Sequence, residues 1–210
     1  WFAADTLEGL GLDASTRIDL SVRGTFTNFA RTVPKILGVT TPEYHESEAI
    51  NGLRKASTER PVLMIPAAVF TATKGKRLRF QLGRALALFH PYHSVAGVRG
   101  ASELQGLVDT LHALHHEPDA ELPLARKLRG QMAEDELALY AELAPGIFAD
   151  PTPPSVEAWL LGVEITASRA GLLLCNDLAV ACHENEESHQ SLGLCSREVI
   201  NDDLLRYCVS

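Results

Sequence analysis

The chain has 210 residues, of which 46% are hydrophobic and 22% charged, a composition typical of a globular protein with an ordinary core. Its net charge of −8 argues against a nucleic-acid-binding surface, because phosphate groups require a basic stripe. No apolar run approaches the roughly 20 residues of a membrane-spanning helix, so we expect no membrane span. The four cysteines include no C-x-x-C pair, which favours a reducing compartment such as the cytoplasm.

The first half of the chain is predicted to contain a helix, a small sheet and a second helical region. Residues 18–22 alternate apolar and polar side chains like a half-buried strand, within an N-terminal extension over residues 1–24. A helix is predicted over residues 25–38, with a kink at Pro34 because an interior proline removes one backbone hydrogen bond. Short strands are predicted over residues 42–48, 50–55 and 62–65. One or two helices are predicted over residues 67–88.

The second half is predicted to be helical. Helices are predicted over residues 101–116, 122–128, 131–143, 156–182 and 197–209. The helix over residues 156–182 is apolar along most of its length, so we expect a long central helix that is buried on most sides. Residues 145–154 hold four prolines and are predicted as a loop. Together these elements predict an α+β fold that is predominantly helical, with its main domain over residues 25–183.

A polar connection and a last helix, residues 184–210, follow that main domain. The connection, predicted over residues 183–193, is rich in Glu, Ser, His and Gln and is therefore expected to be a loop. The last helix carries an apolar pattern up to its end. We therefore expect the domain to continue in a longer parent chain.

Four segments of the chain have the order and spacing of segments in a known enzyme family. They are residues 25–38, the strand-like residues 61–66, the helical residues 76–93 and residues 163–171. The last segment places Glu164, Ala167 and Gly171 in the pattern Glu-x-x-Ala-Asp-x-x-Gly, with Ser168 in place of the Asp. In this order the segments resemble the HtpX-type family of gluzincin zinc metallopeptidases, in which that Glu is the third zinc ligand.

The resemblance implies that residues 80–88 occupy the place of the helix with the zinc motif His-Glu-x-x-His, whose Glu is the general base. Those positions hold Arg84, Ala85 and Leu88 here. Arginine keeps its proton and offers no lone pair, alanine carries no base and leucine has no donor atom. Only Glu164 remains of the three ligands. The resemblance therefore implies a degenerate metallopeptidase domain, gluzincin-like in fold, for which we expect no bound metal and no cofactor.

Arg84 and Glu164 are expected to bind one another between two core helices. A guanidinium can replace the charge of the missing metal and can bond a carboxylate through two N–H groups. We therefore expect a non-catalytic pseudo-peptidase that acts as a protein-interaction or scaffold module within a larger protein or assembly. Its partner would be another protein or the rest of the parent chain. The former substrate groove, beside the edge of the small sheet, would hold a peptide as an added strand.

The histidines leave an alternative open, a metallohydrolase with relocated zinc ligands. His90 and His93 lie three residues apart, and His112 and His116 lie four apart and so share one helix face. Together with Glu164 they are the candidate ligands of such a site. We favour a solvent-exposed, His-rich helix end instead, because few further ligands are predictably nearby.

Overall fold

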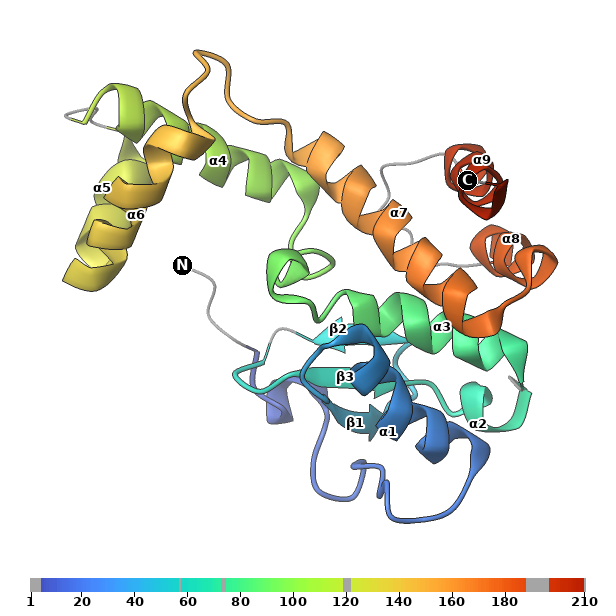
Figure 1. Ribbon diagram of the computed structural model, residues 1–210. Helices are drawn as coiled ribbons and strands as arrows, with labels where there is room; N and C mark the ends of the chain where they lie inside the picture. The colour runs from blue at the N-terminus through green and yellow to red at the C-terminus, as the bar shows by residue number, and fades with distance from the viewer. Residues whose placement is uncertain (1–4, 57, 73–74, 119–121, 188–196, 210) are drawn as a thin grey trace. The chain divides into compact units, whose positions relative to one another are not determined.

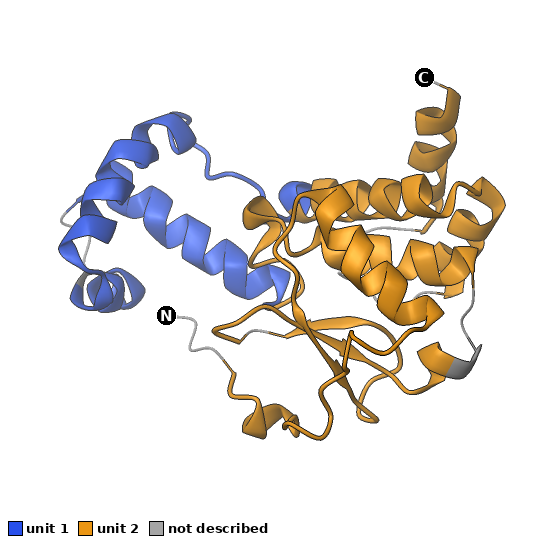
Figure 2. Ribbon diagram, turned by 60° about the horizontal axis from the view of Figure 1, so that its bottom comes forward, with its two compact units in different colours: residues 1–3, 99–159 blue, residues 4–98, 160–210 orange. Residues whose placement is uncertain are grey.

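The computed structural model describes residues 5–56, 58–72, 75–118, 122–187 and 197–209. The protein is mostly helical with one small three-stranded sheet, which confirms the predicted α+β fold class (Figure 1). Its described residues divide into two compact units, shown in different colours in Figure 2: unit 1 lies within residues 99–159, and unit 2 lies within residues 5–98 and 160–209. Unit 1 is thus an insertion in the sequence of unit 2, a division that the sequence alone did not indicate.

Unit 2 contains the sheet and most of the helices. Its elements are the 3-10 helix η1 (Glu8–Leu10), α1 (Thr25–Leu37), β1 (Glu43–Glu46), β2 (Arg54–Ala56), β3 (Val62–Ile65), α2 (Ala68–Ala72), α3 (Lys76–Ala87), the 3-10 helix η2 (Pro91–His93), α8 (Leu178–Glu187) and α9 (Arg197–Val209). Unit 1 contains α4 (Ala101–His116), α5 (Pro123–Gln131) and α6 (Glu134–Ile147). Helix α7 (Val156–Cys175) begins in unit 1 and continues in unit 2.

The sheet is covered on both faces. β3 is its central strand, parallel to β1 and antiparallel to β2. Leu63 and Ile65 of β3 pack against α1 and α3 on one face. Val62 and Met64 pack on the other face against the N-terminal segment around Leu12. Because β3 is buried on both faces, its sequence is a continuous apolar run without alternation.

Helix α1 retains Pro34 in its interior because a side chain from the sheet replaces the lost hydrogen bond. Proline has no N–H for the carbonyl four residues earlier, which belongs to Ala30. The hydroxyl of Tyr44 on β1 donates to this carbonyl at 2.9 Å. Gly38, in the left-handed conformation with φ 66°, then ends the helix as predicted. The contact between Tyr44 and Ala30 therefore joins α1 to the sheet at the proline.

Several predicted bounds in the first three quarters of the chain are wrong. The strand predicted over residues 50–55 begins only at residue 54, because residues 50–53 form no strand. Residues 18–22 form no strand, because the carboxylate of Asp19 accepts hydrogen bonds from the backbone and hydroxyl of Ser21 and turns the chain. The loop predicted from residue 145 begins later, since α6 continues through Pro145 to Ile147. Pro145 lies in the last turn of α6.

The long helix predicted over residues 156–182 is two helices. α7 ends at Cys175, and Asn176 adopts a left-handed conformation with φ 49°. The carboxylate of Asp177 then accepts the Val180 N–H at 3.1 Å and caps α8. α8 continues to Glu187, into the predicted polar connection, and residues 188–196 of that connection lie outside the described residues.

Helix α7 is also less buried than predicted, although it is apolar. Leu173 on this helix is 63% exposed. By length and composition, α7 is the one helix among the described residues that could cross a membrane. Its most apolar stretch of 18 residues has a mean hydropathy of 1.4, and 44% of that stretch is buried. Its packing against α3, through Gly171 and the buried Glu164, accounts for an apolar helix in the core of unit 2.

Helices α3 and α7 approach closely because glycines lie where they cross (Figure 1). A Cβ atom at Gly171 would lie 2.8 Å from the carbonyl oxygen of Phe80. A Cβ atom at Gly83 would lie 2.6 Å from Leu174 Cδ1 and 3.0 Å from the Gly171 Cα atom. Further along the crossing, Ala87, Ala167 and Ala170 form a small buried cluster. Small residues therefore set the distance between the two helices.

One side chain of α4, that of Gln105, joins this helix to the C-terminal end of unit 1. The amide nitrogen of Gln105 donates to the carbonyl of Pro154 at 3.1 Å, and its amide oxygen accepts the Val156 N–H at 2.8 Å. Tyr140 on α6 donates its hydroxyl to the carbonyl of Leu111 on α4 at 2.7 Å. These bonds hold α6 and the start of α7 to α4 within the unit.

We expect Gly171→Ala to destabilise the protein by about 1–3 kcal/mol, because the added methyl group would clash with the Phe80 carbonyl. Gly162→Ala, on the same helix, is the matched control, since a Cβ at this position would meet no atom within 4 Å. This control should be neutral or stabilising by up to about 1 kcal/mol through helix propensity. Urea denaturation followed by circular dichroism measures both. Equal effects of the two substitutions would contradict the close crossing.

Candidate functional site

The residues that the sequence singled out lie where α3 crosses α7 in unit 2. Arg77, Gln81 and Arg84 follow one another at spacings of four and three residues along α3, so they share one face of this helix. Glu164 lies in the third turn of α7 and Glu184 lies on α8. The polar face of α3 is therefore turned towards α7 and α8, while Leu78, Leu82 and Leu86 face the sheet.

Arg84 and Glu164 form a buried ion pair across this crossing. Arg84 Nη2 donates to Glu164 Oε1 at 2.7 Å, and the two side chains are 7% and 2% exposed. The pair predicted from the sequence is therefore confirmed. Burial lowers the pKa of the Arg84 guanidinium, and the charge and hydrogen bond of Glu164 oppose that shift. A guanidinium titrates so far above neutral pH that Arg84 stays charged and the pair stays ionic.

The rest of the polar face of α3 is paired in the same way. The buried carboxylate of Glu184 accepts hydrogen bonds from Arg77 Nε and, at 2.6 Å, from Gln81 Nε2. At the start of α3, Lys76 Nζ lies 2.7 Å from Asp177 Oδ2, the residue that caps α8. These contacts fix α8 against α3.

The three positions that the resemblance assigns to zinc ligands lie close together, but their side chains do not fit a metal. Arg84 contacts Glu164 directly, and Leu88 packs against the alanine cluster of the crossing. Ala85, at the general-base position, is 3% exposed and belongs to the core. Arginine and leucine offer no lone pair, and an oxygen of Glu164 is bound by the guanidinium. No hydrolytic step through zinc follows from these residues.

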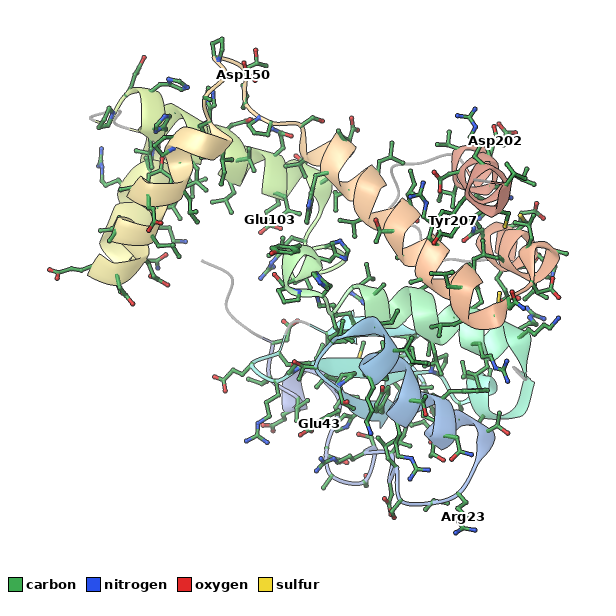
Figure 3. All side chains as sticks on the ribbon, viewed as in Figure 1. Arg23, Glu43, Glu103, Asp150, Asp202 and Tyr207 are labelled. Carbon is green, nitrogen blue, oxygen red and sulfur yellow. The ribbon has the colours of Figure 1, made fainter. Side chains whose placement is uncertain are left out.

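Ser168, at the position that the resemblance assigns to the family's Asp, contacts α8. Its hydroxyl is buried and lies 3.4 Å from Asn185 Oδ1 on α8, and Asn185 in turn donates to Asn201 on α9 at 3.3 Å. The neighbouring Arg169 binds Asp203 on α9 through two hydrogen bonds, of 2.6 and 2.8 Å. Tyr207, labelled in Figure 3, lies under the same guanidinium at 5.0 Å. This part of α7 therefore holds the C-terminal helices.

The four candidate histidine ligands come together only as two pairs, one in each unit. The rings of His90 and His93 have centroids 5.5 Å apart in unit 2, and those of His112 and His116 are 4.5 Å apart in unit 1. His112 Nε2 lies 2.9 Å from the carbonyl of Asp150, labelled in Figure 3. Within the described ranges no three His, Cys, Asp or Glu side chains are arranged to hold a metal ion.

Lys55 on β2 is a chemical feature that the sequence did not reveal. Its ammonium donates to the carbonyls of Leu88 at 2.8 Å and Ser94 at 2.6 Å, and lies 3.4 Å from that of His93. Burial lowers the pKa of Lys55 to about 8. The residue therefore ties β2 to the end of α3 and to the turn after it. A lysine in a short polar strand gives no sequence signal for such a contact, which joins segments 33 residues apart.

The two edges of the sheet differ in their availability for strand addition. The chain itself covers β1, because Ile18 N–H donates to the Tyr44 carbonyl and Glu46 N–H donates to the Thr16 carbonyl, both at 2.8 Å. The other edge is the three-residue strand β2. A peptide held as an added strand would therefore have to pair with β2.

We expect Arg84→Met and Glu164→Met each to cost about 3–5 kcal/mol, because each leaves the other residue of the pair as an uncompensated buried charge. The double substitution Arg84→Met, Glu164→Met should recover most of this loss. A double-mutant cycle by urea denaturation measures the coupling. Lys76→Met is the exposed comparison, with an expected cost below about 1 kcal/mol. Additive single effects would show that the two charges do not depend on one another.

Lys55 should make the free energy of unfolding rise with pH above about 8. The pKa of this lysine is about 8 in the folded protein and ordinarily 10.5. Between these values the unfolded chain binds more protons at Lys55 than the folded chain, so stability increases as the solution becomes more basic. The unfolding free energy of the wild type, relative to Lys55→Met, should therefore be greater at about pH 10 than at about pH 7. A difference that is independent of pH would contradict the lowered pKa.

Comparison with known proteins adds no relative to these observations. No family model matches the chain, and neither a curated protein nor a solved structure matches it. The four sequence segments that carry the resemblance and the geometry of the α3–α7 crossing are therefore the basis of the function proposed below.

Proposed function

We propose that this chain is a non-catalytic, metallopeptidase-like domain that acts as a protein-interaction module. The observation that carries the proposal is the buried ion pair between Arg84 and Glu164. Its two residues occupy two of the three positions that the resemblance assigns to zinc ligands, and Leu88 at the third position packs beside the crossing. In this arrangement the guanidinium of Arg84 on α3 takes the place that the metal ion would have in a zinc site.

The electrostatics of the crossing support this proposal. A buried carboxylate such as Glu164 requires a compensating positive charge, which a zinc ion would supply in a peptidase. The guanidinium of Arg84 supplies that charge here at 2.7 Å and cannot be deprotonated at neutral pH. Arg84 therefore keeps α7 anchored to α3 without a metal, and it leaves no activated water for hydrolysis. A domain without catalytic residues can still function by binding a partner protein.

The proposal predicts that a zinc site can be rebuilt. The variant Arg84→His, Leu88→His places two histidines four residues apart, in the last turn of α3 and at its C-cap, beside the retained Glu164, which gives three protein ligands. We expect this variant to bind about one zinc ion per chain and to gain thermal stability when zinc is added, since the metal binds only the folded state. Elemental analysis after dialysis and thermal denaturation with and without zinc measure these two effects.

The control adds Glu164→Gln to the same two substitutions. It keeps both histidines but removes the third ligand, so zinc affinity should fall by about tenfold or more. Wild-type protein should respond to zinc in neither assay. A folded double variant that takes up no zinc, or zinc uptake that is unchanged when Glu164→Gln is added, would count against the metallopeptidase-like frame. Stoichiometric zinc in the wild-type protein would overturn the non-catalytic assignment.

A further inference from the structure

Unit 1 carries an apolar groove that is separate from the α3–α7 crossing. The groove has a volume of about 500 Å³ and is lined by residues of α4 and α6 and by the end of α5. Its lining is mostly apolar, with Leu107 and Leu111 from α4 and Leu139 and Leu143 from α6. The groove is formed entirely by residues of one unit.

The α6 side of the groove is a row of exposed apolar side chains. Leu139, Leu143 and Ile147 are 54%, 49% and 56% exposed. They are spaced four residues apart, so they form one row along the helix. At a rise of 1.5 Å per residue the row is about 12 Å long, which is slightly more than two helical turns. A contiguous apolar row of this length marks an interaction surface more often than a solvated one.

The charge around this row is acidic. Asp135 and Glu142 lie four residues before and three residues after Leu139, so both lie beside the row on the same side of the helix, and Glu136 lines the groove itself. Between residues 99 and 159 the sequence has eleven acidic and four basic residues, whereas the whole chain has 27 and 19. Most of the net charge of −8 therefore lies in unit 1.

We propose that the groove binds an amphipathic helix of a partner protein, with Leu-like side chains against the apolar row and Lys or Arg beside Asp135 and Glu142. Helices recognised in this way place apolar anchors at i, i+4 and i+7 in a groove between two helices. The acidic flank selects a basic helix over an acidic one through complementary charge. The inference deepens the interaction role proposed above, yet it depends on no residue of the crossing. Zinc uptake and helix binding can therefore fail separately.

Three fluorescent synthetic peptides of about 16 residues test the proposal, a length that extends beyond the row at each end. The first carries leucines at i, i+4, i+7 and i+11 with lysines on the flanks. The second replaces the lysines by glutamates. The third keeps the composition of the first in scrambled order. Fluorescence anisotropy should show that the first peptide binds at least about tenfold more tightly than either of the others at low salt.

Substitutions on the protein locate the binding. Leu143→Gln changes an exposed groove residue and should weaken binding of the lysine peptide by about tenfold or more. Leu173→Gln, at a similarly exposed leucine on α7, is the matched control and should leave binding unchanged. The pair Asp135→Lys, Glu142→Lys should shift the preference towards the glutamate peptide. Circular dichroism confirms that each variant is folded.

Three results would overturn the inference. The first is that no peptide binds the wild-type protein. The second is binding that does not respond to Leu143→Gln or that is equal for ordered and scrambled lysine peptides. The third is a dimer in sedimentation velocity that Leu143→Gln dissociates while the lysine peptide fails to compete, because the occupant of the groove would then be a second copy of this chain.

Discussion

The contact between α3 and α7 is the constraint on which unit 2 depends. Glycines at positions 83 and 171 let the two helices approach until the backbone of one touches the side chains of the other. At that distance Arg84 reaches Glu164 directly, and both lose nearly all contact with water. A buried ion pair of this kind adds little net stability over a well-packed apolar pair, but breaking one half is costly. The pair therefore fixes which face of α7 meets α3 more than it strengthens the contact.

Further ion pairs join the helices of unit 2 next to this crossing. Glu184 binds the first half of the polar face of α3, and Arg169 links α7 to α9 through Asp203. The interior of unit 2 is thus held by charges that are paired from helix to helix. At the crossing itself the buried carboxylate of Glu164 is bound by a cation that is covalently part of the chain. The interaction surface that we propose lies elsewhere, on the apolar and acidic face of unit 1.

Much of the fold was predictable where glycine and proline mark the ends of elements. The bounds of α4 and α9 agree with those predicted, and Gly38 ends α1 as expected. The break at Asn176 was missed because the residues on both sides of it are apolar, although asparagine tolerates the left-handed conformation and Asp177 is a common N-cap residue. Residues 18–22 carried the alternation of a strand, but only Ile18 bonds to β1, and a local bond at Asp19 turns the chain after it. In both cases local backbone conformation and side-chain hydrogen bonds determined the structure, and the apolar pattern did not.

The site was predictable only in part, for a related reason. The pair Arg84–Glu164 followed from a resemblance that supplied the long-range proximity of two helices 80 residues apart. Nothing comparable pointed to the bonds between Lys55 and the carbonyls after α3, or to the groove between α4 and α6. Such contacts depend on how helices pack, which neither the periodicity of apolar residues nor the spacing of motifs reveals. The division into two units was not predicted for the same reason. The segments before and after unit 1 do not differ from it in their helical sequence pattern.

The bonds of Gln105 bear on the order in which the chain folds. Closing the 80-residue loop between Arg84 and Glu164 carries an entropic cost that grows with the logarithm of loop length. Gln105 and Val156 are 51 residues apart and are joined within unit 1, so unit 1, once formed, removes most of that loop. At about 0.6 kcal/mol for each halving, the saving is roughly 1 kcal/mol. In a chain in which unit 1 is already folded, closing the α3–α7 crossing therefore has a lower entropic cost.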